Sequence, residues 1–128
     1  MDEYNKSLIK RWHDSRVFNL EKDRFKQKRI ISTEITTIDS YSMTSKSLYP
    51  YLLADTFNRY FKMCGENIYY IIGIDTASYV SYSFLSNHYL DSKNMLKEYL
   101  DVLNIMGVGF DYESIITLSL IHISEPTR

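Results

Sequence analysis

The chain has 128 residues, a formal net charge of −1 and 45% hydrophobic residues, which suits one globular domain or part of one. Its near-neutral charge excludes a bulk basic surface, so we expect no DNA partner. The single cysteine excludes an intrachain disulfide framework. The sequence has no apolar run of membrane length and no targeting signal, so we expect no membrane partner and a cytoplasmic location.

Residues 1–28 predict an amino-terminal helix and a connector. Tyr4, Leu8 and Trp12 recur at steps of four, which indicates a helix over residues 3–15. Basic and acidic residues are interleaved in the stretch that follows. This mixture is typical of a solvated connector, and contact with RNA is the alternative.

The next stretch predicts a strand, a polar loop, a helix and a second strand. Residues 29–38 (RIISTEITTI) are rich in β-branched side chains, and 39–47 are polar. A helix over 49–64 ends at Gly65 in a left-handed cap, and the apolar run 68–72 (IYYII) is a buried strand. This order predicts two parallel strands joined by a right-handed helical crossover.

The helix at 49–64 has an apolar and a polar face. Pro50 fits its first turn, where no amide donor is needed. We expect the apolar face, including Cys64, to pack on the core and the polar face to meet solvent. The apolar residues are Leu53, Phe57, Tyr60, Phe61 and Cys64, and the polar residues are Asp55, Asn58, Arg59 and Lys62.

The rest of the chain predicts one more clear helix. Residues 76–90 have no clear helical period, so we expect an irregular segment with a short helical piece. Asp91 or Ser92 then caps a helix that Gly107 and Gly109 end. Its apolar face is Met95, Leu96, Tyr99, Leu100 and Leu103. The predicted fold class is α/β, a truncated Rossmann-like parallel sheet with flanking helices and open edges over 29–117.

Short motifs between Leu52 and Asp75 resemble the ATP-binding half of a class I aminoacyl-tRNA synthetase, a HUP-type domain. They are Asp55, Arg59-Tyr60, Lys62-Met63, Gly65, Asn67 and Gly73-Ile74-Asp75. The flanking stretches YNKSLIKRW, VFNLEKD and KNMLKEYLDVLNIMGVGFDYESIITLS are most similar to leucyl-tRNA synthetase, with a methionyl, valyl or isoleucyl enzyme as the alternative. The resemblance covers about residues 4–117. It implies a monomeric parent that uses ATP with Mg²⁺ to activate leucine and transfer it to tRNA.

The resemblance also locates an ATP-binding slot. In the family, a HIGH motif at the start of the first core helix holds the ATP phosphates. Here Thr44, Ser45, Lys46 and Ser47 occupy that slot, without the two histidines or the glycine. Lys46 and three hydroxyl groups at a helix N-terminus could still receive phosphate, and a polar loop that caps a helix is the alternative. We assign no catalytic residue.

Asp75 is the candidate for amino-acid binding. In the family, the matching aspartate lies near the bound amino acid and can pair with its ammonium group. At the carboxyl end of a parallel strand, Asp75 would face the crevice where ligands bind, although aspartate is also a common turn residue. His13 and His88 form no cluster, and no metal-ligand spacing occurs, so we expect no metal site.

Residues 118–128 (LSLIHISEPTR) resemble a translated sequencing adapter. We therefore expect a non-native tail that adds no packed element, with the natural reading frame cut near Thr117. Two functions remain open. The chain is either the amino-terminal fragment of a leucyl-tRNA synthetase-like protein, inactive by itself, or a non-catalytic module that binds a nucleotide or an amino acid.

Overall fold

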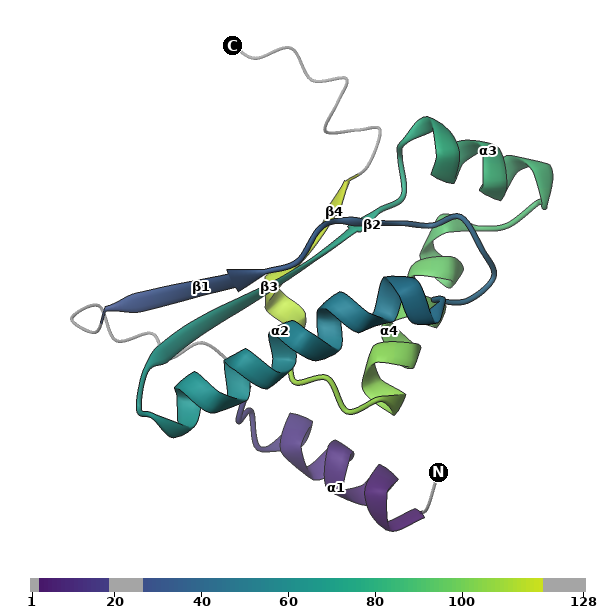
Figure 1. The fold of residues 1–128 in the computed structure, drawn as a ribbon. Coiled ribbons are helices and arrows are strands. Elements are labelled where there is room, and N and C mark those ends of the chain that lie inside the picture. Colours follow the sequence, from purple (N-terminus) through teal and green to yellow (C-terminus); the bar gives the residue numbers. More distant parts are fainter. Residues whose placement is uncertain (1–2, 19–26, 119–128) are drawn as a thin grey trace.

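The computed structural model of the chain describes residues 3–18 and 27–118. In Figure 1, α1, α2 and α4 lie on one side of a small sheet, and α3 lies beyond the sheet's carboxyl end. The elements are α1 (Glu3–Asp14), β1 (Lys28–Ser32), β2 (Thr36–Thr37), α2 (Ser45–Met63), β3 (Asn67–Asp75), α3 (Tyr79–Asn87), α4 (Ser92–Ile105), the 3-10 turn η1 (Tyr112–Ser114) and β4 (Ile115–Leu118).

The strand β3 is the centre of the sheet, and β1, β2 and β4 all pair with it in parallel. The predicted parallel pairing of 29–38 with 68–72 is therefore confirmed, as is the helix between them. Handedness of the crossover stays a prediction. The α/β class and the Rossmann-like parallel sheet are also confirmed.

The first strand is interrupted, which the sequence prediction missed. Ser32 pairs with Ile71 and Thr36 pairs with Ile74, so four steps on this strand match three steps on β3. One extra residue is thus accommodated between β1 and β2, as in a bulge. Such an insertion depends on the partner strand, so the β-rich run 29–38 reads as one continuous strand in the sequence.

The strand β4 was missing from the sequence prediction, which included only two strands. Ile115 to Leu118 pair with the last four residues of β3. The backbone of Leu118 therefore pairs with Asp75, although the sequence prediction placed this residue in a non-native tail. Residues 119–128 lie outside the described part of the chain, so the prediction for them is untested.

The core lies between the sheet and the helices α2 and α4. Alternate residues of β3 are almost fully buried there, because successive side chains of a strand point to opposite faces. The predicted apolar face of α4 is confirmed. The core cluster consists of Ile38, Met43, Tyr51, Ala54, Tyr70, Ile72, Ile74, Leu85, Met95, Tyr99, Leu103, Val108 and Phe110.

Helix caps match the local sequence signals. Gly65, with φ +83°, ends α2, and the amides of Gly65 and Glu66 donate to carbonyls of the last turn. Asp91 caps α4, accepting from Asn94 N at 3.2 Å. The segment 76–90 is more regular than expected, because Ser78 caps the nine-residue helix α3.

The prediction for the start of α2 was wrong. The helix begins at Ser45 rather than near Tyr49, because the Thr44 hydroxyl accepts from Ser47 N and caps an additional turn. Pro50 consequently lies inside the helix, beyond its first turn. It has no amide hydrogen to donate to the carbonyl of Lys46, so the helix lacks one of its regular hydrogen bonds there.

The assignment of the two faces of α2 was also wrong. Asp55 and Asn58 are buried, whereas Leu53, Phe57 and Tyr60 are about half exposed. The apolar stripe that the periodicity predicts to be buried therefore faces outward. The sole cysteine, Cys64, belongs to that stripe and is exposed as well.

A buried polar network explains this orientation. Asp55 Oδ1 accepts from Gly109 N at 2.9 Å, and Asn58 Nδ2 donates to Gly109 O at 3.0 Å. Asp55 Oδ2 accepts from Arg59 Nε at 2.8 Å, and the same guanidinium donates to Gly107 O. Buried backbone groups need partners, and the polar face of α2 supplies them to the segment after α4.

Opposite substitutions on the two faces of α2 test this orientation. Asp55→Leu should lower the free energy of unfolding by about 1–3 kcal/mol, because the buried Gly109 amide loses its acceptor. Leu53→Ala should change it by less than about 0.5 kcal/mol, since the side chain is half exposed. Urea denaturation of both variants measures the difference. A larger loss for Leu53→Ala than for Asp55→Leu would show that the helix packs by its apolar stripe.

Candidate functional site

The candidate site lies at the carboxyl edge of the sheet, where β2 and β3 end. The two strands are parallel, so Thr37 and Asp75 reach the same edge. The next residue after β2, Ile38, is fully buried, and its amide donates to Asp75 O at 3.2 Å and to Ser81 Oγ at 3.1 Å. The Ser81 hydroxyl in turn donates to Asp75 O at 2.7 Å. These bonds fix the edge against α3.

Thr44, Ser45, Lys46 and Ser47 form the start of α2 rather than a loop. Thr44 is the N-cap, and its hydroxyl accepts from Ser47 N at 3.3 Å. Thr44, Ser45 and Lys46 are exposed. The amides of Ser45 and Lys46 precede the first bond within the helix, so they and the Lys46 ammonium can meet an anion.

The Asp75 carboxylate is already engaged in its own turn. Its Oδ1 accepts from the amides of Ala77 and Ser78, both at 2.9 Å, and the residue is 6% exposed. Burial raises the pKa of this carboxyl. Hydrogen bonds from Ser78, Ala77 and Thr37 outweigh burial and hold the pKa below its ordinary value. An ammonium ligand could meet only the oxygen that these amides leave open.

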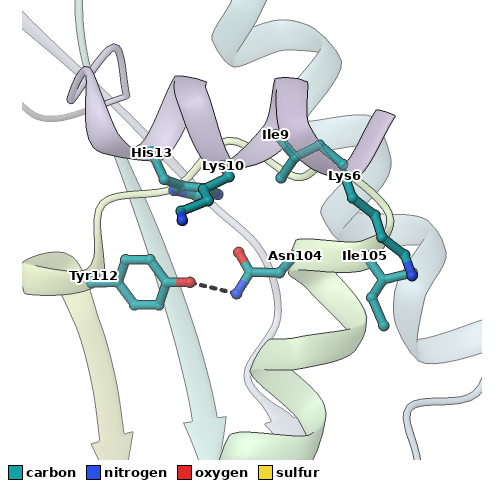
Figure 2. A pocket seen from close by; sticks show the side chains of 7 residues that line it. All are labelled: Lys6, Ile9, Lys10, His13, Asn104, Ile105 and Tyr112. Atoms are coloured by element: carbon teal, nitrogen blue, oxygen red, sulfur yellow. Dashed lines mark hydrogen bonds between the residues drawn. The ribbon is translucent and has the colours of Figure 1, made fainter. Parts of the chain in front are cut away.

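The fold thus brings the two predicted sites to one edge of the sheet. Among the described residues, cavities lie elsewhere. One lies between α1, α4 and η1, one beside the amino ends of β1 and β3, and one between α1 and α2. The cavity against α4 is lined by Lys6, Ile9, Lys10, His13, Asn104, Ile105 and Tyr112 (Figure 2). The sequence prediction missed it, although Lys6, Lys10 and His13 recur at the spacing of one helix face.

His13 is part of an aromatic cluster. Its ring lies 5.5 Å from that of Tyr112 and 5.8 Å from that of Phe110. Burial lowers the pKa of His13, Asp14 opposes this effect and Arg59 adds to it. His88 is exposed and lies at the end of α3, in another part of the fold. Among the described residues, no three His, Cys, Asp or Glu side chains are grouped so as to hold a metal ion.

Comparison with known proteins bears on the fold. No protein-family model matches the sequence, and no curated protein matches it. The structure is similar to that of the AgnB2 leucyl-tRNA synthetase of Agrobacterium radiobacter K84, solved in a ternary complex with tRNA and LeuAMS. The TM-score is 0.80 over 90% of this chain, at 11% sequence identity. The fold is synthetase-like.

The chain spans a small part of the length of the solved enzyme. The match covers 15% of the chain of the leucyl-tRNA synthetase. At 11% sequence identity, it shows a likeness of fold alone. Within residues 3–18 and 27–118 of this chain, no helix is long and apolar enough to cross a bilayer.

The pH dependence of stability tests the role of Asp75 in the turn. Because its folded-state pKa lies below the ordinary value, its contribution is present above about pH 4 and is lost as pH falls through the folded pKa. Asp75→Asn should therefore destabilise the protein by about 1–2 kcal/mol at pH 7, because charge-assisted hydrogen bonds become neutral ones, and by less at pH 3. Urea denaturation at both pH values measures this, with exposed Asp39→Asn as control for the lost charge. A constant difference between Asp75→Asn and the parent chain would contradict it.

Proposed function

We propose that this chain is the amino-terminal part of the nucleotide-binding domain of a leucyl-tRNA synthetase-like protein. In that protein, ATP with Mg²⁺ would activate leucine for transfer to tRNA. The chain by itself would bind a nucleotide weakly and lack ligase activity. A cytoplasmic, monomeric protein is part of this proposal, as the resemblance implies. The synthetase-like fold and the motifs between Leu52 and Asp75 support this proposal.

One observation carries the nucleotide part of the proposal. Helix α2 is the next element after β2 in the chain, and its first turn carries the exposed Lys46. Parallel α/β sheets bind ligands at this edge, and a helix N-terminus attracts phosphate. Ser45 and Lys46 would hold the phosphates through their amides and the ammonium group. The described part of the chain offers no acidic cluster for Mg²⁺, so the metal would arrive with the nucleotide.

A leucine site at Asp75 is the less supported part of the proposal. Its carboxylate is nearly buried and accepts two amide hydrogen bonds. An ammonium group would have to approach the remaining oxygen. A non-catalytic module that binds only a nucleotide is therefore the second candidate function. The absence of the HIGH histidines and glycine from Thr44–Ser47 favours it.

Nucleotide binding is tested by two matched lysine variants. Lys46→Ala should weaken ATP binding by about fivefold, because an exposed charge pair is worth up to about 1 kcal/mol. Lys93→Ala removes an exposed lysine from the second position of α4 and should have no effect. Titrations followed by amide chemical shifts measure both. Equal affinities of the two variants for ATP would contradict a nucleotide site at the start of α2.

Amino-acid activation is tested by ATP–pyrophosphate exchange with leucine, methionine, valine or isoleucine. We expect no exchange above background with the purified 128-residue chain. Losing one positioned donor to the transition state lowers a rate by about a hundredfold or more, and the HIGH slot lacks several. Robust exchange with leucine would refute the non-catalytic reading. Exchange with another of these amino acids would instead point to a methionyl, valyl or isoleucyl relative.

A further inference from the structure

The cavity between α1, α4 and η1 has the features of a ligand site that the nucleotide proposal does not use. Its volume is about 310 Å³, at the lower end of the range of small-molecule pockets. In Figure 2, four side chains reach it from α1, and Asn104 and Tyr112 close it from below. These residues offer a hydrogen-bond acceptor, positive charge and apolar walls.

Asn104 supplies an acceptor without a partner. Its Nδ2 donates to the Tyr112 hydroxyl, which fixes the amide plane. Its Oδ1 is buried and accepts no hydrogen bond from any described residue. A buried acceptor left unpaired destabilises a protein by about 1–3 kcal/mol, and such groups call for an explanation. A hydrogen-bond donor on a bound molecule would be such an explanation.

Two lysines supply positive charge at the same cavity. Lys6 and Lys10 lie one helical turn apart on α1, and in Figure 2 the Lys10 ammonium lies above the Asn104–Tyr112 pair. Among the described residues, the ion pairs are Arg29–Glu66 and Arg59–Asp55, and neither involves these lysines. The two ammonium groups favour an anion.

The rest of the lining is apolar or aromatic. Ile9 and Ile105 stand on opposite sides of the cavity, and the Tyr112 and His13 rings lie 5.5 Å apart. Such walls favour a ligand with a compact hydrophobic body. A ligand with a second ammonium group is disfavoured, because two lysines already carry positive charge there.

We propose that this cavity binds a small apolar carboxylate that also carries a neutral N–H or O–H donor. The carboxylate pairs with Lys10, whose ammonium lies above the Asn104–Tyr112 pair, and Lys6 adds positive charge at the Ile105 end of the cavity. The donor satisfies Asn104 Oδ1, and the apolar body lies between Ile9 and Ile105. The proposal is independent of the nucleotide site at the start of α2, which shares none of these residues.

Three probe molecules test the proposal on the full chain. Indole-3-acetate has a carboxylate, an aromatic body and an indole N–H. Naphthalene-1-acetate has no N–H donor, and 3-methylindole has no carboxylate. Amide chemical-shift titrations should give a dissociation constant of about 1 mM or below for indole-3-acetate, and at least about fivefold weaker binding for each of the other two. Equal binding of indole-3-acetate and naphthalene-1-acetate, or no binding of indole-3-acetate, would overturn the proposal.

Variants locate the binding on the cavity. The double variant Lys6→Gln, Lys10→Gln should weaken indole-3-acetate by about tenfold, whereas Lys97→Gln, an exposed lysine on α4, should not change it. Asn104→Leu should remove the preference for indole-3-acetate over naphthalene-1-acetate. Unchanged binding by the double variant would place the ligand elsewhere and overturn the assignment. The comparison of probes needs no variant, so it decides the question even if Asn104→Leu does not fold.

Discussion

The structure depends on the hydrogen bonds between the polar face of α2 and the backbone that follows α4. Gly109 is buried, and its amide and carbonyl are both bound by side chains of α2, Asp55 and Asn58. A Cβ on Gly109 would overlap the Phe18 ring, so the segment after α1 packs against the same backbone. The Arg59 guanidinium, paired with Asp55, lies 4.9 Å from that ring. Helix α2 and the segments that follow α1 and α4 thus meet at one buried stretch of backbone.

This network also explains why the sequence predicted the wrong face of α2. Helical periodicity reveals that a helix has two faces, but assigning one to the core rests on the rule that polar side chains meet solvent. Here Asp55 and Asn58 bind backbone groups about fifty residues away, a relation that no local pattern contains. The apolar residues Leu53 and Phe57 are left about half exposed. By contrast, the caps at Gly65 and Asp91 depend on neighbouring residues only, and the sequence predicted both.

The same distinction applies to the sheet and the candidate site. A strand–helix–strand order favours parallel pairing, so the sequence could place Lys46 and Asp75 at the carboxyl edge. The break between β1 and β2 depends on the partner strand. A Cβ on Gly73 would lie 2.9 Å from Ile35 Cγ1, which shows how closely the interrupted strand approaches β3. The orientation of the Asp75 carboxylate depends on the amides at the start of α3, in a segment that the sequence left irregular.

The groups left open at the carboxyl edge decide which ligand chemistry the edge favours. Its free groups are donors, namely the first amides of α2 and the Lys46 ammonium, whereas its buried carboxylate is largely satisfied by Ala77 and Ser78. Donors at a helix N-terminus select anions. A carboxylate that already accepts two amides gains less from a cation, because a new partner must compete for the same charge. The edge is therefore better suited to an anion than to the ammonium group of an amino acid, which is why the proposed function rests on the start of α2 rather than on Asp75.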